Sequence, residues 1–183
     1  SKILDTVKSK LIQANTATTS ADGRESIRKD ITKLLEQLDN IAQQTNYNGN
    51  YLLQLDATSG AAATAALEFQ VGEKTSDMIT MSAVRANTTG LTLTALTALT
   101  TSGTLTTTAA QTGQGSVDSA ITELNGYRGD IGSTQNQVES AVRNLMTQST
   151  NIKAAESVIR DVDYAEESAN FNKLNIISQA GSY

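Results

Sequence analysis

The chain has 183 residues with 14 basic and 19 acidic side chains, which gives a net charge of −5 (14 − 19). It contains no Cys, His, Trp or Pro, so the sequence excludes disulfides, thiolate metal sites and the commonest general base. The acidic balance argues against nucleic acid or an anionic membrane as a partner, and no apolar run reaches the roughly 18 residues that a membrane span needs.

Two segments near the start of the chain carry helical periodicity. The first predicts a short helix through apolar residues spaced three and four apart: Leu4, Val7, Leu11 and Ala14. It stops in 15-NTATTSADG-23, a run of turn formers. The second predicts a helix from about residue 24 to 45 through Ile27, Ile31, Leu34, Leu38 and Ile41. The following 46-NYNGN-50 predicts a tight turn at Asn48-Gly49.

The longest periodic segment lies in the second half of the chain and predicts one helix from about residue 116 to 160. Its predicted contact face, mostly apolar, consists of Val117, Ile121, Leu124, Arg128, Ile131, Gln135, Val138, Val142, Leu145, Ser149, Ile152, Glu156 and Ile159. Gly126, Gly129 and Gly132 would each cost about 1 kcal/mol relative to Ala. We therefore expect another backbone to approach the helix closely at these glycines.

The middle of the chain has a different composition. Residues 67–72 and 78–84 have the character of short strands and predict a β-hairpin around 73-EKTSD-77. No charged residue occurs from Ala86 to Val117, and Thr makes up half of the residues from 88 to 109. We expect an irregular connection on the surface with a short strand around 91-LTLTAL-96. Attachment of O-linked sugar to its hydroxyls is the alternative.

A cluster of acidic residues follows the long predicted helix in 160-RDVDYAEESANF-171. Its carboxylates are Asp161, Asp163, Glu166 and Glu167. They could hold Ca²⁺ or Mg²⁺ or act as an acid/base pair, but the spacing of Gly and Glu in a calcium loop is missing. The apolar series breaks after Ile159, and Asp161 and Asp163 are good capping residues. We therefore predict a joint between two helices at Asp161, Asp163 and Tyr164.

These elements together predict a mainly α fold. We expect an elongated antiparallel helical bundle with a small β-hairpin region, in which two shorter helices, laid end to end, pack against one long helix from the carboxyl side. A helix of about 45 residues would be near 65 Å long, which is more than a compact domain of this size needs. Such bundles are usually parts of assemblies, so a structural role is favoured over an enzyme.

Two long stretches resemble bacterial flagellin: 31-ITKLLEQLDNIAQQTNYNGNYLL-53 and 131-IGSTQNQVESAVRNLMTQSTNIKAAESVIRDVDYAEESANFNKLNIISQAG-181. The part from Lys153 to Phe171 is most similar to flagellins of the Campylobacter and Helicobacter group. The resemblance implies a secreted structural subunit of the flagellar filament, which forms a helical homopolymer for motility and has neither cofactor nor metal. It also implies an export chaperone and the filament cap as partners. A hook–filament junction protein or another secreted coiled-coil appendage or adhesin is the alternative.

The resemblance also implies a division of the chain. Residues 1–56 and 114–165 would form the helical rod domain of the family. Residues 57–113, the hairpin and the Thr-rich connection, would stand in place of the variable outer domains, and residues 166–183 would begin the terminal inner-layer helix. We expect a core fragment that lacks both terminal segments of the family.

The Toll-like receptor for flagellin binds the rod of the family. By resemblance the receptor-facing residues of this chain are Thr6, Ser9, Lys10, Gln13 and Asp30. Well-recognised members carry Arg at the position of Thr6, an acidic residue at that of Ser9 and an apolar residue at that of Lys10. Thr6 cannot provide a guanidinium fork, and Lys10 places a charge where apolar surface is preferred. The resemblance therefore implies weak or no binding to this receptor.

Overall fold

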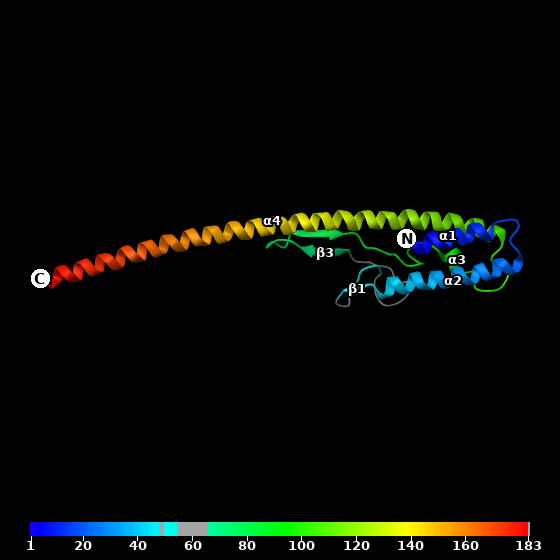
Figure 1. Ribbon diagram of the computed structural model, residues 1–183, viewed down its shortest axis with the longest axis horizontal. Helices are drawn as coiled ribbons and strands as arrows, with labels where there is room; N and C mark the ends of the chain where they lie inside the picture. Colours follow the sequence, from blue (N-terminus) through cyan, green and yellow to red (C-terminus); the bar gives the residue numbers. More distant parts are fainter. Residues whose placement is uncertain (48–49, 55–65, 183) are drawn as a thin grey trace. The chain divides into compact units, whose positions relative to one another are not determined.

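The computed structural model describes residues 1–47, 50–54 and 66–182. Its helices are α1 (Lys2–Ala14), α2 (Ala21–Gln44), α3 (Thr94–Thr97) and α4 (Thr107–Gly181) (Figure 1). The strands are β1 (Asn46–Tyr47), β2 (Asn50–Tyr51), β3 (Leu67–Gln70) and β4 (Met78–Met81). The mainly α class is confirmed. No helix in the described part of the chain is both long and apolar enough to cross a membrane.

The strands form two small sheets. β1 and β2 are antiparallel, with Asn46 opposite Tyr51, and the turn predicted at Asn48-Gly49 between them lies outside the described residues. β3 pairs with β4 where the hairpin was predicted. Contacts divide the chain into two compact units, Ser1–Phe69 with Ile79–Gln135, and Gln70–Met78 with Asn136–Tyr183.

In the first unit, α1 packs against both α2 and the beginning of α4. Lys10 Nζ lies 3.2 Å from Asp30 Oδ2 of α2, and Lys8 Nζ lies 2.6 Å from Asp118 Oδ1 of α4. At the other end of α1, the hydroxyl oxygen of Ser1 accepts a hydrogen bond from Arg128 Nη1 at 3.3 Å. Lower numbers on α1 meet higher numbers on α4, so these two helices are antiparallel (Figure 1).

The expected end-to-end arrangement of α1 and α2 is wrong, because the two helices lie side by side. The segment between them, residues 15–20, is short and capped. Asn15 N–H bonds to Leu11 O at 3.0 Å where α1 ends, and the hydroxyl of Ser20 accepts from Gly23 N at 3.0 Å where α2 begins. A chain that reverses within so few residues brings the apolar faces of both helices together, and both are buried there.

One core joins the helices of this unit. It consists of Leu4, Val7, Leu11, Ala14, Ile27, Ile31, Leu35, Leu38, Leu91, Leu93, Leu96, Leu105, Ala110, Val117 and Ala120. The predicted face of α1 is confirmed in full. On α2 the predicted face is rotated slightly, because Leu35 and Ala42 are buried whereas Leu34 is half-buried and Ile41 is 44% exposed.

The Thr-rich segment, residues 86–106, is part of this core, so the expected surface connection with a strand is wrong. Leu91, Leu93 and Leu96 are at most 2% exposed, and the last of these lies in α3, a single helical turn. The backbone bonds to itself instead of to a neighbouring strand: Leu91 N donates to Asn87 O and Leu93 N to Thr88 O, both at 2.9 Å. Burial of the leucines and these local hydrogen bonds stabilise a turn conformation instead of the strand that the alternating Leu and Thr residues predicted.

The predicted bounds of the long helix are also wrong. α4 begins at Thr107 rather than near residue 116, and it is helical without interruption to Gly181. Thr106 caps its start, since Ala109 N donates to Thr106 Oγ1 at 3.1 Å. The predicted end relied on caps at Asp161 and Asp163, but both residues lie in helical turns, and the chain after them keeps good helix formers.

The glycines of α4 differ from expectation. A Cβ built at Gly126, Gly129 or Gly132 meets nothing within 4 Å, so the expected close approach of another backbone is absent at these described positions. The close approach occurs at Gly113 instead, where a Cβ would lie 2.6 Å from Leu96 Cδ2. This contact places the Thr-rich segment directly on α4.

Gly90 is required by its surroundings. Its amide donates to Asn87 Oδ1 at 2.7 Å, and a Cβ built there would collide with the carbonyl oxygen of Arg85. We therefore expect Gly90→Ala to lower the free energy of unfolding by about 1–3 kcal/mol, measured by urea denaturation. The matched control Gly126→Ala adds the same methyl group in open helix and should raise stability by about 1 kcal/mol. Equal midpoints for the two variants would contradict this account.

Candidate assembly surface

The part of α4 beyond Gln135 exposes many large apolar side chains. They are Val142, Leu145, Met146, Ile152, Val158, Ile159, Val162, Tyr164, Phe171, Leu174, Ile176 and Ile177, with exposures from 41% to 76%. Single exposed apolar residues are ordinary, but a continuous series marks an interaction site. We call residues 142–177 of α4 the distal segment.

The first half of the distal segment carries one apolar stripe. Val142, Leu145, Ile152 and Ile159 continue the contact face predicted from the sequence, with Ser149 and Glu156 at the remaining positions. Spacings of three and four are those of a helix that packs along a second helix. Near the start of α4 this face is buried at Val117, but within the described residues it is exposed in the distal segment. The spacing of the apolar residues thus identifies a helix-packing face, but no second helix covers it within the described residues.

The second half of the distal segment is apolar on several sides. With 3.6 residues per turn, its apolar side chains fall into groups: Val158, Val162 and Ile176 on one side, Tyr164 and Phe171 on a second, and Leu174 and Ile177 on a third. A helix that is apolar all round is stable when it is buried among several neighbours. A single partner helix covers one of these sides and leaves the others in water.

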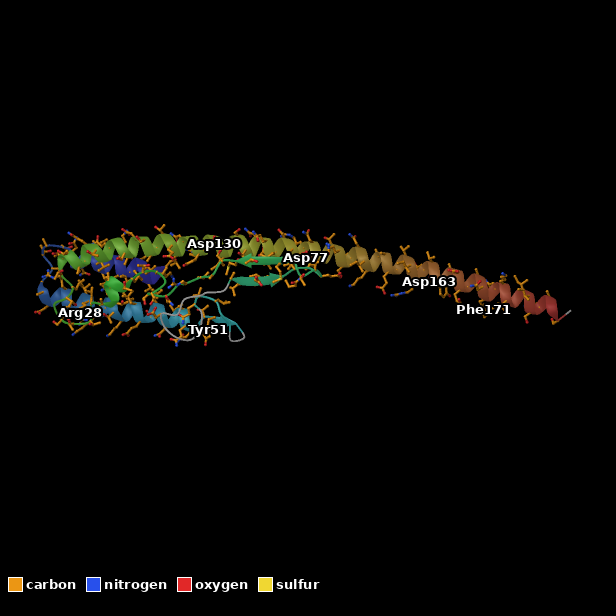
Figure 2. The ribbon with its side chains drawn as sticks, turned by 180° about the vertical axis from the view of Figure 1, so that it is seen from behind. Arg28, Tyr51, Asp77, Asp130, Asp163 and Phe171 are labelled. Carbon is orange, nitrogen blue, oxygen red and sulfur yellow. The ribbon has the colours of Figure 1, made fainter. Side chains whose placement is uncertain are left out.

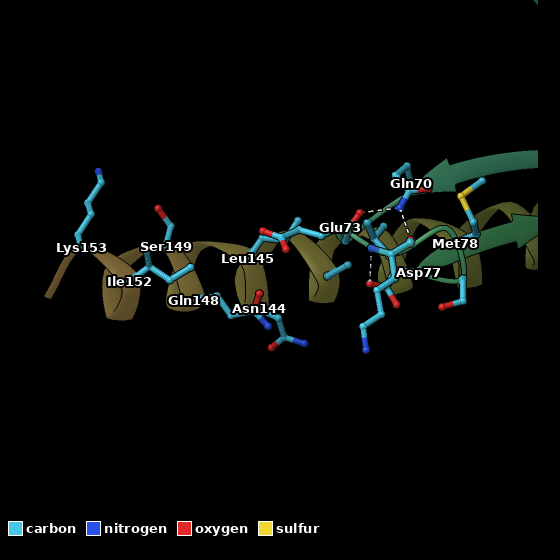
Figure 3. Close-up of a pocket in the computed structure, with 15 residues that line it drawn as sticks. Gln70, Glu73, Asp77, Met78, Asn144, Leu145, Gln148, Ser149, Ile152 and Lys153 are labelled. Carbon is cyan, nitrogen blue, oxygen red and sulfur yellow. Dashed lines mark hydrogen bonds between the residues drawn. The ribbon is translucent and has the colours of Figure 1, made fainter. Parts of the chain in front are cut away.

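A groove opens where the β3–β4 turn meets the distal segment (Figure 3). It has a volume of about 990 Å³ and is lined by residues of the turn and by Leu145 and Ile152 of α4. The turn is held by its own bonds: Gln70 Nε2 donates to Gly72 O at 2.5 Å and to Lys74 O at 2.7 Å, and Lys74 N donates to Asp77 Oδ2 at 3.2 Å. The groove floor belongs to the same apolar stripe, so we treat it as part of the assembly surface.

The acidic cluster of the distal segment lies on the exposed surface of α4. Asp161, Asp163, Glu166 and Glu167 are all exposed, and at 3.6 residues per turn the last three share one side of the helix while Asp161 lies on the opposite side. Among the described residues no group of three or more metal-ligating side chains is placed to hold an ion. Figure 2 shows Asp163 and Phe171 projecting from an unbroken helix, so the interruption predicted at Asp161, Asp163 and Tyr164 is wrong.

The residues predicted to face a receptor lie on the outside of α1 and α2. Thr6, Ser9 and Gln13 are exposed on one face of α1, and Thr6 Oγ1 donates to Lys2 O at 2.8 Å. Lys10 is half-buried and reaches Asp30 of α2 at 3.2 Å. The structure thus brings the five positions onto neighbouring surfaces, whereas their role in binding stays a prediction.

Comparisons with known proteins agree on a family. The model of the bacterial flagellin N-terminal helical region matches residues 1–58, and that of the C-terminal helical region matches residues 114–183. The chain is 35% identical over 147 residues to YvzB of Bacillus subtilis (strain 168), a flagellin by name, and the match covers 80% of this chain and 86% of that protein. This chain belongs to the bacterial flagellin family.

Other flagellins are similar over different lengths. Flagellin A of Helicobacter pylori is 59% identical over 66 residues, which is 36% of this chain and 13% of that flagellin, so the similarity to that group is partial. The crystal structure of Bacillus cereus flagellin matches with a TM-score of 0.61 and 28% identity, over 84% of this chain and 82% of that one. The chain spans less than two thirds of the length of several flagellar relatives it matches.

Because the distal segment is exposed, we expect its backbone amides to be poorly protected from hydrogen exchange. An isolated helix is marginal in water and depends on tertiary packing. In the free chain we expect amides of the distal segment to exchange at least about 100-fold faster than those of Ala110–Ala120, as measured by mass spectrometry. Equal protection of both parts of α4 would mean that the distal segment is stabilised without a partner.

Proposed function

We propose that this flagellin is a structural subunit of the bacterial flagellar filament. It assembles with copies of itself into a helical homopolymer outside the cell, for motility. The observation that carries this proposal is the distal segment of α4, which exposes apolar side chains on several sides. A filament supplies neighbours on every side of a subunit, whereas a two-chain complex supplies one. Membership of the flagellin family points to the same role.

The proposal assigns parts of the chain to layers of the filament. Residues 1–56 and 114–165 make up the rod, residues 57–113 stand in place of outer domains, and residues 166–183 begin the inner-layer helix. Asp161, Asp163 and Tyr164 mark the transition between rod and inner layer along one continuous helix. The role is structural and involves no catalysis.

Further partners follow from the same exposed surface. Before assembly the distal segment would be open to aggregation, because contiguous apolar surface on a monomer is a liability. An export chaperone that covers it, and a filament cap that guides its insertion, are the partners that we assign. The net charge of −5 argues against nucleic acid or an anionic membrane as a partner, because both attract basic surfaces.

Assembly of the full-length protein tests this function. Leu174 is 65% exposed in the chain, so Leu174→Lys should leave the subunit folded but bury a charge upon assembly, at a cost of several kcal/mol. We expect this variant to form no long filaments after salt-induced assembly, as judged by electron microscopy. Asn125→Lys adds the same charge at an exposed polar position of α4 outside the distal segment; it is the matched control and should assemble like wild type.

Two results would contradict the proposal. Filaments of equal length and yield from Leu174→Lys and from wild type would show that this surface is not buried by assembly. Short rings or caps formed by the wild-type protein, in place of long filaments, would favour a junction or cap protein instead.

We further propose that the chain escapes the Toll-like receptor for flagellin. Thr6 is exposed and short, and its hydroxyl is occupied by the carbonyl of Lys2. Lys10 carries a charge and pairs with Asp30, so the acidic side chain is partly neutralised. A receptor pocket that binds a guanidinium group and an adjacent apolar side chain would therefore have neither ligand on this face of α1.

The double variant Thr6→Arg and Lys10→Leu tests receptor escape. We expect it to activate receptor-bearing reporter cells at concentrations at least about 10-fold lower than wild type, a gain of about 1.4 kcal/mol in binding. The double variant Thr18→Arg and Lys33→Leu makes the same two exchanges at exposed positions outside the predicted receptor-facing residues, and it is the matched control. Wild-type protein as active as an ordinary flagellin would overturn the idea.

A further inference from the structure

An ion pair on α2 holds the far end of the Thr-rich segment. Arg28 binds Glu25 through two nitrogens: Nη2 lies 2.6 Å from Oε1, and Nε lies 3.0 Å from Oε2. Its remaining nitrogen, Nη1, donates to the carbonyl oxygen of Leu99 at 3.2 Å. Glu25 Oε2 also accepts a hydrogen bond from Gly103 N at 3.3 Å. Each member of the pair therefore also binds the backbone of the segment.

This pair is more shielded than the other ion pairs of the described residues. The side chains of Arg28 and Glu25 are 11% and 22% exposed, whereas those of Lys8 and Asp118 are 42% and 55% exposed. Exposed pairs contribute little because water screens them, but a forked arginine–carboxylate pair with fixed partners is stronger and directional. The charges face a segment that has none of its own.

The backbone that the pair binds covers an edge of the core. Leu96 and Leu105, on either side of the bound turn, are 2% and 3% exposed. Between them the chain reverses at Gly103, whose φ of 82° is in the left-handed region that favours glycine. At the near end of the segment, Asp39 of α2 binds the amide and hydroxyl of Thr88, both at 2.8 Å. The segment is thus tied to α2 at both ends and packed by leucines between.

We propose that the Glu25–Arg28 pair is a latch, which keeps residues 98–106 closed over the core and which remains closed in acid. The remainder of the segment is held by leucine burial, whereas residues 100–103 are exposed. The bonds of Thr100 N to Ala98 O and of Thr104 to Thr101 O stay within the turn, so the latch is what ties the turn to α2. Opening the latch releases the turn and uncovers Leu105 without unfolding the helices.

The charges around Glu25 explain resistance to acid. Hydrogen bonding from Arg28 lowers the pKa of Glu25 from its ordinary value of 4.5 to about 2; partial burial opposes this shift, and the Gly103 amide and the charges of Arg28 and Lys29 add to it. Arg24 lies in the adjoining cleft, and the groups from the Thr-rich segment and from the start of α4 are uncharged. Because the folded pKa is the lower one, the stabilisation is fully present above about pH 4.5 and is lost as the pH falls through about 2.

Hydrogen exchange of the intact chain tests the latch. We expect Glu25→Gln and Arg28→Lys each to speed exchange in peptides covering 98–106 at least about 10-fold, which corresponds to roughly 1.4 kcal/mol. Exchange in α1 and in Ala110–Ala120 should stay at the wild-type rate. Glu36→Gln, which removes a carboxylate from an exposed position of the same helix, is the matched control and should change nothing.

Resistance of the latch to acid is tested by comparing hydrogen exchange of wild type and Glu25→Gln at the same low pH. At pH 3.5 the wild-type turn should still exchange at least about 10-fold more slowly than in Glu25→Gln, because the carboxylate is still ionised. Unchanged exchange in both latch variants, or an equal increase throughout the chain or in Glu36→Gln, would overturn the latch. A wild-type turn that exchanges like Glu25→Gln at pH 3.5 would overturn its resistance to acid.

Discussion

The burial of one face of α1 is the constraint on which the rest of the first unit depends. Leu4, Val7, Leu11 and Ala14 are fully buried, and they contact elements from three other parts of the chain. α2 folds back on this face, α4 runs antiparallel to α1, and Leu96 of the Thr-rich segment packs beside Leu11 at Gly113 of α4. Without α1 each of these elements would have an apolar face and no common surface on which to bury it.

α4 illustrates how one pattern leads to two outcomes. Its apolar series continues from Val117 to Ile159, yet Val117 is buried, Ile121 and Leu124 are half-buried, and the distal segment is exposed. The difference lies in the partner and not in the helix, since hydrophobic burial requires a second surface. This division explains why one helix contributes to a folded core and also exposes an extensive apolar surface.

The Thr-rich segment shows where reasoning from the sequence reached its limit. Its alternating Leu and Thr suit a strand, and its lack of charge suits a surface connection, so both readings followed local rules. The leucines are buried instead, because an uncovered edge of the helical core was available and the segment could satisfy its backbone through local turns. The ties from Glu25, Arg28 and Asp39 involve residues far apart in sequence, and no local pattern indicates such pairings.

The helical class, the buried face of α1, the position of the hairpin and the flagellin family could be predicted from the amino-acid sequence. These features depend on periodicity and on long matching stretches, which are local or linear properties. Three other features became apparent in the folded molecule: α1 and α2 lie side by side, α4 continues through Asp161 and Asp163, and the close approach is at Gly113 rather than Gly126. Each of these depends on which surfaces meet in space. The end of a helix depends on the balance between capping and helix propensity, and a contact at a glycine depends on which element packs over it. Neither can be read from the local sequence.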